Sequence, residues 1–588
     1  MKSNITKLSI ITIISLFTLA VIGLSYAYFS TEITGEGKYV TLDTATLKLK
    51  YTDNTVLSLD NAIPGDFVTK TFTVENIGTK KVSYNIVWNN LINTINNYDL
   101  QLDMKCKSYK DYNTSSKVES GECSSFYKAV PYTETSINKD IKRNNEIDIG
   151  ITHEYTVTIT FKNRSYNQND NLNKKFTGKI DLEEYIDPSP DPIYCTFDGE
   201  LTQGAEYVNG QYTYRYKQEG SYNYSGNDLV WSSISIDGWG VQLTNKTSTD
   251  PVTSKSCTYI NNRPVVSMTM MFNGSQATNI DLSSFDTSNV TNMSTMFVDS
   301  KAIMLDVSNF NTGKVTDMSA MFDGSQATTL DVSNFDTSNV TNMGAMFEYS
   351  QVTSLDVSNF DTSKVTNMNS MFYGSKATTL DLSNFNTSKV TSMNSMFNNS
   401  EATILDVSNF DTSKVTDMSY MFSSSKVTIL DVSNFNTSNV TNMSGMFNGS
   451  KATKLDVSDF DTSSVTDMEG MFAVSKATTL DLNNFDTSNV TNMSSMFSFC
   501  QATSIDLSSF DTSKVTDMHY MFSNSTNLKA IYASNKFNTD AVTSSTEMFY
   551  DCTSLVGGSG TKYNLRYIDK TYARIDGGTS NPGYFTAK

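Results

Sequence analysis

A phrase of twenty-five residues recurs without a gap through the second half of the chain. A Met-Phe pair marks each copy, at Met271-Phe272, at Met296-Phe297 and so on to Met521-Phe522. A last pair, Met548-Phe549, arrives two residues later than the period requires. A fixed period of this length is typical of a solenoid, in which each copy is one turn of a stacked coil. We therefore expect residues 263–554 to form a solenoid of about ten full repeats.

The copy at residues 302–325 illustrates the coil that we expect. Leu305 and Val307 alternate with polar residues, which predicts one short strand. Val315, Met318 and Phe322 lie three and four residues apart, which predicts one short helix of about two turns with these side chains inward. One such coil buries too few apolar side chains to offset the entropy of ordering its backbone. Pairing and stacking between neighbouring coils must therefore stabilise the array.

The repeated phrase also carries a family resemblance. Residues 355–372 read Leu-Asp-Val-Ser-Asn-Phe-Asp-Thr-Ser-Lys-Val-Thr-Asn-Met-Asn-Ser-Met-Phe, which resembles the BspA-like leucine-rich repeat surface proteins of bacteria. The resemblance implies a right-handed leucine-rich-repeat solenoid on the cell surface, with adhesion to host or matrix proteins or to other bacteria. Phe310 departs from the general leucine-rich pattern, because it falls where an Asn ladder usually runs. We therefore expect a buried Phe column, and hydrogen bonds between coils from Asn309, Thr312 and Thr316 or from the backbone.

Residues 28–187 are predicted to form an all-β sandwich. Tyr155, Val157, Ile159 and Phe161 alternate with polar residues, the period-two pattern of a half-buried strand. Similar runs occur elsewhere in this region with no helical pattern between them. Several strands in succession without helices favour an antiparallel sandwich.

This amino-terminal part resembles a secreted family. The apolar segment at the start precedes Tyr28-Phe29-Ser30, and Pro64-Gly65-Asp66 leads into residues 71–76. These motifs resemble those of the TasA/camelysin-like secreted matrix proteins of Gram-positive bacteria. The resemblance implies an exported β domain.

Three shorter regions complete the predicted multidomain chain. Residues 188–193 form a Pro-rich linker, and residues 194–262 form a small aromatic-rich β module. The aromatic side chains of this module, among them Tyr212 and Trp239, suit either its own core or a sugar-stacking platform. Residues 555–588 are expected to be a C-terminal cap, since the end of a solenoid must be closed.

The amino terminus has the pattern of an export signal. Lys2 and Lys7 supply a positive start before an apolar stretch at residues 8–24, and Ser25-Tyr26-Ala27 supplies small residues for cleavage after Ala27. Residues 1–27 are then a signal peptide. The alternative is an uncleaved membrane anchor, because residues 8–24 approach the ~20 residues that span a bilayer. Both interpretations predict an exported protein, at the cell surface or secreted.

The six Cys residues suit an exported protein. Cys500 and Cys552 occupy the same place in copies two coils apart, hence ~9–10 Å at the spacing of stacked strands. That separation exceeds the reach of a disulfide, so we predict two free thiols. The natural local disulfide pairs, each within its own region, are Cys106 with Cys123 and Cys195 with Cys257.

One acidic residue per copy follows the leucine of the predicted strand, and we name this set the Asp column. Three interpretations are open: carboxylates that are solvated and bonded to neighbouring Ser or backbone groups, an acidic contact strip for a basic partner, or a Ca²⁺ site between coils. As the uniform side of the solenoid, the column is a possible ligand-facing ladder. Its members are Asp281, Asp306, Asp331, Asp356, Asp381, Asp406, Asp431, Asp456, Asp481 and Asp506.

Composition argues against several functional classes. The formal net charge of −18 disfavours nucleic acid and anionic membrane surfaces as partners. The chain has two His residues, and His153-Glu154 begins a zinc-protease pattern that lacks its second His. We therefore expect no catalysis, no cofactor and no metal.

The predicted function is binding by a surface. We expect a bacterial cell-surface or secreted repeat protein that binds proteins or glycans of host, matrix or neighbouring cells through an extended solenoid face. Only the amino-terminal segment would contact a membrane. The alternative is a structural extracellular-matrix or fibre component, in which the β domain assembles and the solenoid is a spacer.

Overall fold

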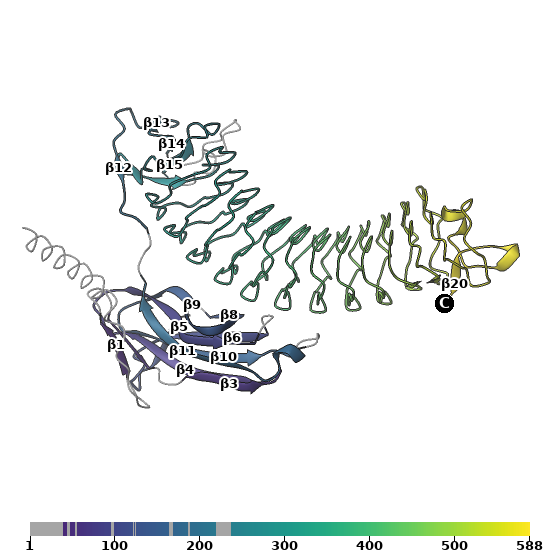
Figure 1. Cartoon of the computed structure of the whole chain (residues 1–588), viewed down its shortest axis with the longest axis horizontal. Helices are drawn as coiled ribbons and strands as arrows, with labels where there is room; N and C mark the ends of the chain where they lie inside the picture. Colours follow the sequence, from purple (N-terminus) through teal and green to yellow (C-terminus); the bar gives the residue numbers. More distant parts are fainter. Residues whose placement is uncertain are drawn as a thin grey trace, which may run out of the picture.

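The structure, a computed structural model, is mostly β, with several sheets and very little helix (Figure 1). It describes residues 39–43, 48–52, 56–95, 99–121, 123, 125–163, 168–185, 189–218 and 237–588. The predicted signal peptide, its cleavage site at Ala27 and the apolar stretch at residues 8–24 lie outside these ranges. In the part of the chain that is described, no helix has the length and apolar character needed to cross a membrane.

The amino-terminal region is a sandwich of two antiparallel sheets. One sheet has the order β1-β2-β4-β10-β6-β7, with β8 also paired to β6, and the other has the order β3-β11-β5-β9. The first comprises β1 (Tyr39–Asp43), β2 (Lys48–Thr52), β4 (Phe67–Asn76), β10 (Ile151–Phe161), β6 (Leu100–Lys110), β7 (Val118–Gly121) and β8 (Phe126–Ala129). The second comprises β3 (Leu57–Ala62), β11 (Lys174–Glu184), β5 (Val82–Asn93) and β9 (Thr133–Ile147), with the 3-10 turn η1 (Asn169–Asn171) before β11.

Alternation along the strands builds the core of the sandwich. Along β10, buried residues alternate with partly exposed ones from Tyr155 to Phe161, as the period-two pattern predicts. Trp88 of β5 and Ile180 of β11 meet them from the opposite sheet in one apolar cluster. The Tyr84 and Tyr155 hydroxyls share a hydrogen bond of 2.8 Å across the sandwich. Burying the apolar faces of two sheets against each other is what stabilises this layer pair.

The small β module shares its core with the coils. Its sheet has the order β12-β16-β17-β15-β14-β13. Tyr212 and Trp239 are fully buried, and the Tyr212 ring packs edge-on against Phe285 of the first coil at 5.8 Å. These two aromatic side chains therefore belong to the core that caps the stack. The strands are β12 (Tyr194–Cys195), β13 (Glu206–Asn209), β14 (Tyr212–Lys217), β15 (Gly238–Leu243), β16 (Tyr259–Ile260) and β17 (Arg263–Ser267).

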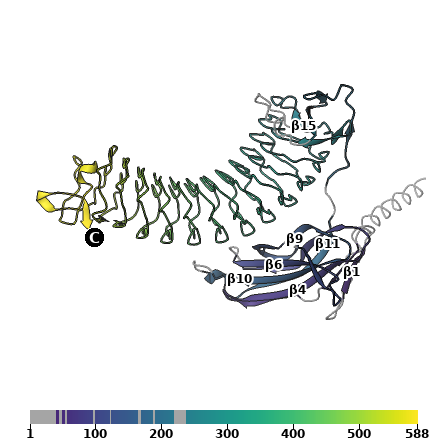
Figure 2. The ribbon, with the colours of Figure 1, turned by 180° about the vertical axis from the view of Figure 1, so that it is seen from behind.

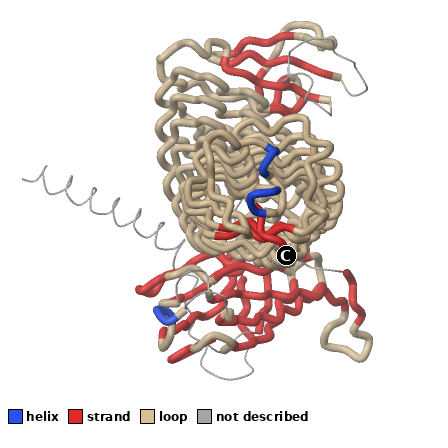
Figure 3. The backbone as a smooth tube through the Cα atoms, turned by 90° about the vertical axis from the view of Figure 1, so that its right-hand side faces the viewer, coloured by secondary structure: helices blue, strands red, loops and turns tan. Residues whose placement is uncertain are grey.

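The described coils are built from turns, and the predicted helix in each coil is wrong (Figure 3). In the stretch that contains Met318 and Phe322, the Met321 N–H donates to the Met318 carbonyl at 3.2 Å and closes a tight turn. Ala320 has a φ of 51°, which a right-handed helix does not accommodate. Met318 and Phe322 are nevertheless buried. Successive tight turns return side chains to the inside at the same three- and four-residue spacing as a helix.

Backbone hydrogen bonds run between coils instead of within a helix. The Met318 N–H donates to the Asn342 carbonyl at 3.1 Å, and the Ala320 N–H donates to the Gly344 carbonyl at 2.8 Å. The same alternate positions bond at later copies. Because a bond to the next coil needs that coil in place, the secondary structure forms only with the stack.

The predicted strand is also shorter than expected in most coils. Near Leu305 and Val307 it is reduced to isolated parallel bridges, such as the one between Met304 and Thr329. Among the described coils, regular strands form only where the array ends. They are β18 (Ser504–Leu507), β19 (Ala530–Ala533) and β20 (Phe585–Ala587), with the 3-10 turns η2 (Lys570–Tyr572) and η3 (Gly578–Ser580) in the closing segment.

Identical side chains stack along the interior. The Phe297 and Phe322 rings lie parallel with centroids 5.5 Å apart, and the column of Phe310 is buried as predicted. Asn309 and Thr316 each donate to carbonyls of the preceding coil, at 3.0 and 3.2 Å. Thr312 donates to a carbonyl of the following coil at 2.9 Å. Each interior layer is therefore completed by its neighbours on both sides.

Candidate functional site

The Asp column lies on the outside of the coils between two buried columns. Asp306 is exposed, whereas its neighbours Leu305 and Val307 are buried. Because side chains alternate at this point of the chain, the carboxylate points outward, while the buried side chains on both sides of it fix the backbone. All ten members of the column are exposed or partly exposed. The column is thus an uninterrupted line of carboxylates along the stack.

In most copies, a serine two residues later in the chain donates hydrogen bonds to the carboxylate of the column. Ser308 donates its backbone N–H at 3.1 Å and its hydroxyl at 2.6 Å to Oδ1 of Asp306. These two donors lower the pKa of Asp306, the hydroxyl contributing most. Asp356 and Asp431 accept the same two bonds at Oδ1 from their own serines. The serine thus occupies Oδ1 within the turn, and Oδ2 is the oxygen that remains for contacts with other groups.

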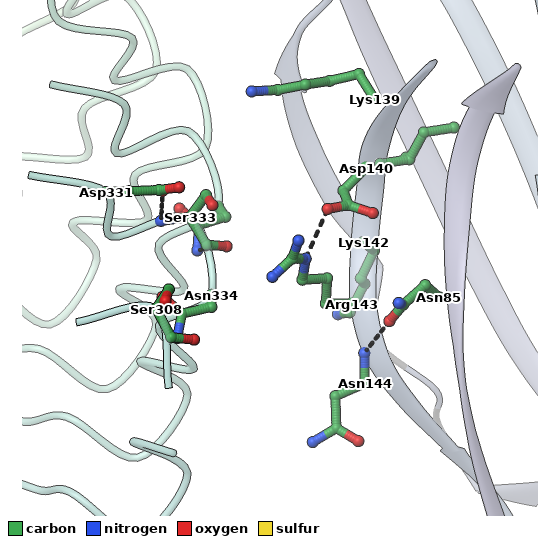
Figure 4. Close-up of polar contacts among 12 residues, drawn as sticks. Asn85, Lys139, Asp140, Lys142, Arg143, Asn144, Ser308, Asp331, Ser333 and Asn334 are labelled. Carbon is green, nitrogen blue, oxygen red and sulfur yellow. Dashed lines mark hydrogen bonds and ion pairs between the residues drawn. The ribbon is translucent and has the colours of Figure 1, made fainter. Parts of the chain in front are cut away.

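The sandwich approaches the middle of the column through strand β9. Lys139 Nζ lies 2.9 Å from Asp356 Oδ2, and both side chains are about half buried at 38% and 45% exposure. Burial opposes ionisation of Asp356, but the Lys139 ammonium and the hydrogen bonds outweigh it and lower the pKa of the carboxyl. Figure 4 shows Lys139 and Arg143 extending from β9 toward the coil that carries Asp331.

Two further lysines of the sandwich lie close to carboxylates of the coils. Burial lowers the pKa of Lys128 to about 8, and the charges of Asp356 and Asp381 oppose this shift. Burial also lowers the pKa of Lys142, again opposed by carboxylates of the coils, those of Asp361 and Asp336. Lys128 Nζ donates to the Ile141 carbonyl of β9 at 2.6 Å. The cations near the coils therefore come from β8 and β9, which belong to different sheets of the sandwich, and the carboxylates that they approach include Asp336 and Asp361 beside the column.

Sequence reasoning identified the column but not the contact with the sandwich. The signal within the sequence is a cluster of cations, Lys139, Lys142 and Arg143, in a stretch without an apolar face. Such a cluster is common on any solvated strand, and nothing in the local pattern names its partner 217 residues away. The contact depends on how two separate units come together.

The cysteine pairs are those expected from the sequence. Disulfides join Cys106 to Cys123 and Cys195 to Cys257, while Cys500 and Cys552 are buried free thiols. Burial raises the pKa of Cys500, and it raises the pKa of Cys552 to about 12. Both thiols are consequently unreactive while the coils stay closed.

Potential metal ligands come together at one place among the described residues. Sγ of Cys106 and Cys123 and a ring nitrogen of His153 lie within 4.8 Å of one another. The two sulfurs form a disulfide and have no thiolate to offer. His153 is 6% exposed, burial lowers its pKa to about 4, and its Nδ1 lies 3.0 Å from the Tyr84 hydroxyl. This group does not fit a metal in the disulfide form. The described part of the Asp column shows no comparable group of three ligands.

A stack of turn-built coils, capped by a small β module and joined to an antiparallel sandwich, defines a multidomain, mostly β repeat protein (Figure 2). Overlapping matches to the family model described as "Mycoplasma protein of unknown function, DUF285" run from residue 245 to residue 580, more than half of the chain, and the chain belongs to that family. They span residues 245–358, 322–429, 349–456, 400–504, 424–534 and 472–580.

The amino-terminal part matches a second family model. Residues 4–182 match the model described as "Camelysin metallo-endopeptidase", which confirms the camelysin-like part of the resemblance seen in the sequence. The kinship of the coils with BspA-like leucine-rich repeats stays a prediction. No curated protein and no solved structure matches the chain.

Proposed function

We propose that this protein is exported to the bacterial cell surface or secreted, and that it binds other macromolecules through the face of the stack that carries the Asp column. The observation that carries the proposal is the regularity of that face. Carboxylates recur once per coil and most are oriented by their own serines, whose hydrogen bonds lower the pKa of Asp306 and of Asp456, whereas burial raises the pKa of Asp381. The camelysin-like match supports a place outside the cell or on its surface.

A repeated weak contact suits such a face. A single half-exposed ion pair contributes about 0.2–1 kcal/mol, so no coil binds tightly alone. Contacts at several coils act together, because each one raises the effective concentration of the next. The expected partners are proteins or glycans of host, matrix or neighbouring cells, with positive charge to match the column. Nucleic acid would be repelled by the same charge.

We propose that the sandwich of this chain works without catalysis, although the name of its family model is that of a metallo-endopeptidase. The support lies in the one group of possible ligands among the described residues, in which Cys106 and Cys123 are oxidised and His153 is buried. Incubation of the full chain with casein and zinc should release no peptides. Zinc-dependent cleavage that EDTA abolishes would overturn this part of the proposal.

The test of the binding proposal uses a variant with all ten Asp column residues replaced by Asn. Asparagine keeps the turn, because Asn386 accepts the Ser388 N–H and hydroxyl at 3.1 and 2.7 Å in the same motif. Full-length wild type and variant are applied to an array of extracellular matrix proteins and glycans at low and high salt. We expect salt-sensitive wild-type binding that the variant loses. Equal binding by both proteins would exclude the column as the binding face.

A structural role in an extracellular matrix is the second candidate. It is favoured by the independence of the sandwich, whose apolar cluster is separate from the one that runs through the module and the coils. In that case the ten-fold Asn variant should still assemble into fibres or matrix as wild type does. Retained assembly together with absent array binding would favour this role over the first.

A further inference from the structure

We propose that the middle of the Asp column is a docking surface for a cationic sheet edge, and that strand β9 of the same chain occupies it as a latch. The sandwich then folds back on the coils and covers part of the face that a partner needs. The closed contact stands independently of the proposed function. Its role as a mask for the binding face rests on that function.

The direct contact joins residues far apart in the chain. Lys139 Nζ meets Asp356 Oδ2 at 2.9 Å across 217 residues. Lys128 and Lys142 lie close enough to the carboxylates of three successive coils to be affected by them, with Asp336 and Asp381 at the two ends. Figures 1 and 2 both place β9 on the side of the sandwich nearest the coils. Several cations therefore face several carboxylates, as a surface fit requires.

Strand β9 has the properties of an exposed edge strand that is protected from pairing with other strands. It is the outermost strand of the four-stranded sheet β3-β11-β5-β9, and its register against β5 shifts four times. An edge strand presents unpaired backbone groups, and charged side chains and bulges keep it from pairing with other strands. Arg143 is held by Asp140 of its own strand at 2.6 Å. Lys139 and Lys142 are consequently the cations of β9 whose charges meet carboxylates of the coils, although the Arg143 side chain also extends toward the coils (Figure 4).

The latch is built to open. The ion pair between Lys139 and Asp356 is half exposed, so salt weakens it: the Debye length falls from ~10 Å at 0.1 M to ~3 Å at 1 M. The two units keep separate apolar clusters, so parting them exposes no common core. A competing cationic ligand therefore does not have to break an apolar core shared by the two units.

A zero-length cross-link tests the closed state. A carbodiimide joins an ammonium and a carboxylate in direct contact as an amide, with loss of water. In the monomeric full chain at low salt we expect a cross-linked peptide between Lys139 and Asp356, with a yield that falls at least about five-fold in 1 M NaCl. The K139M variant should lose it. Absence of the cross-link from monomer at low salt, or a yield indifferent to salt, overturns the latch.

A lysine decapeptide tests whether the latch masks the column. The K139M/K142M variant should bind the peptide several-fold more tightly than wild type, because the column is uncovered. The control K105M/K107M removes two equally charged, exposed lysines from β6 and should bind as wild type does. No difference between the two variants would refute masking.

The two experiments separate the latch from the binding function. If the cross-link forms but neither the wild type nor the variants bind the peptide, the closed contact is supported and the column is excluded as a binding face. Peptide binding that the ten-fold Asn variant loses, without any cross-link, would sink the latch and keep the binding face. Small-angle scattering supplies a second readout, since K139M/K142M should have a larger radius of gyration than K105M/K107M.

Discussion

Replacement of one buried Phe by Ala should destabilise one region of the stack. Phe497 is fully buried, with the parallel rings of Phe472 and Phe522 at 5.9 and 5.7 Å on its two sides. Replacement of a buried Phe by Ala costs about 3–5 kcal/mol, because apolar contacts are lost and a cavity is left. Since each coil contacts only its neighbours, the loss falls on local opening of this region.

A thiol of the chain reports that opening. Cys500 is buried and unpaired, and its N–H donates to the Phe497 carbonyl at 3.3 Å. It reacts with an alkylating reagent only when the coil opens, so its rate follows the opening free energy when closing is fast. At about 1.4 kcal/mol per factor of ten, the F497A change should raise the labelling rate at Cys500 by about two to three and a half orders of magnitude. Mass spectrometry of the labelled peptide measures it.

The matched control lies two residues away. Phe499 is 49% exposed, in the same coil, so its replacement by Ala should change the labelling rate at Cys500 less than about three-fold. Cys552, farther along the stack, should respond to F497A more weakly than Cys500. Equal acceleration by F497A and F499A, or a change below ten-fold for F497A, would refute the stacked-ring account of coil stability.

Three further outcomes are expected from the turns and carboxylates. Val474 is a β-branched residue at a φ of 56° and is 47% exposed, so V474G should stabilise the chain by up to about 1 kcal/mol in urea unfolding. The reverse change G449V, at the equivalent place one coil earlier, should destabilise the chain. Changes of the same sign in the two variants would contradict the strain argument. Burial and the Asp323 carboxylate raise the pKa of Glu348 to about 7. The folded state therefore holds this proton longer than the unfolded one, and unfolding free energy should fall as pH rises from about 4.5 to 7; E348Q should reduce that fall, and an unchanged pH profile would disprove it. EDTA and millimolar Ca²⁺ should leave the melting temperature unchanged, because one carboxylate per coil supplies too few oxygens for calcium, and a calcium-dependent rise would restore the metal interpretation of the Asp column.

The proposed latch would connect the two halves of the chain in function. If the column binds partners as proposed, the charged edge strand of the same molecule competes with them for it. Lys139 therefore links the fold of the sandwich to the availability of Asp356. A partner with few cations would have little effect on the closed form, so the latch favours ligands that engage several coils at once.

Sequence alone determined the stack and its inward-facing residues. An exact repeat of twenty-five residues places equal side chains at equal heights, and equal neighbours bury each other, so Phe310 and Phe322 had to form columns. Two short-range rules also sufficed elsewhere: alternation predicted the strand at Tyr155–Phe161, and local spacing predicted the pairs formed by Cys106 and Cys195.

Tertiary structure decided what local pattern leaves open. The three- and four-residue spacing of Val315, Met318 and Phe322 is compatible both with a helix and with consecutive turns. The hydrogen bonds to Asn342 and other residues of the next coil selected the turns. The meeting of Lys139 with Asp356 likewise has no local signature. Periodicity records which side chains face inward, whereas bonds between distant segments depend on geometry that arises only when the units are assembled.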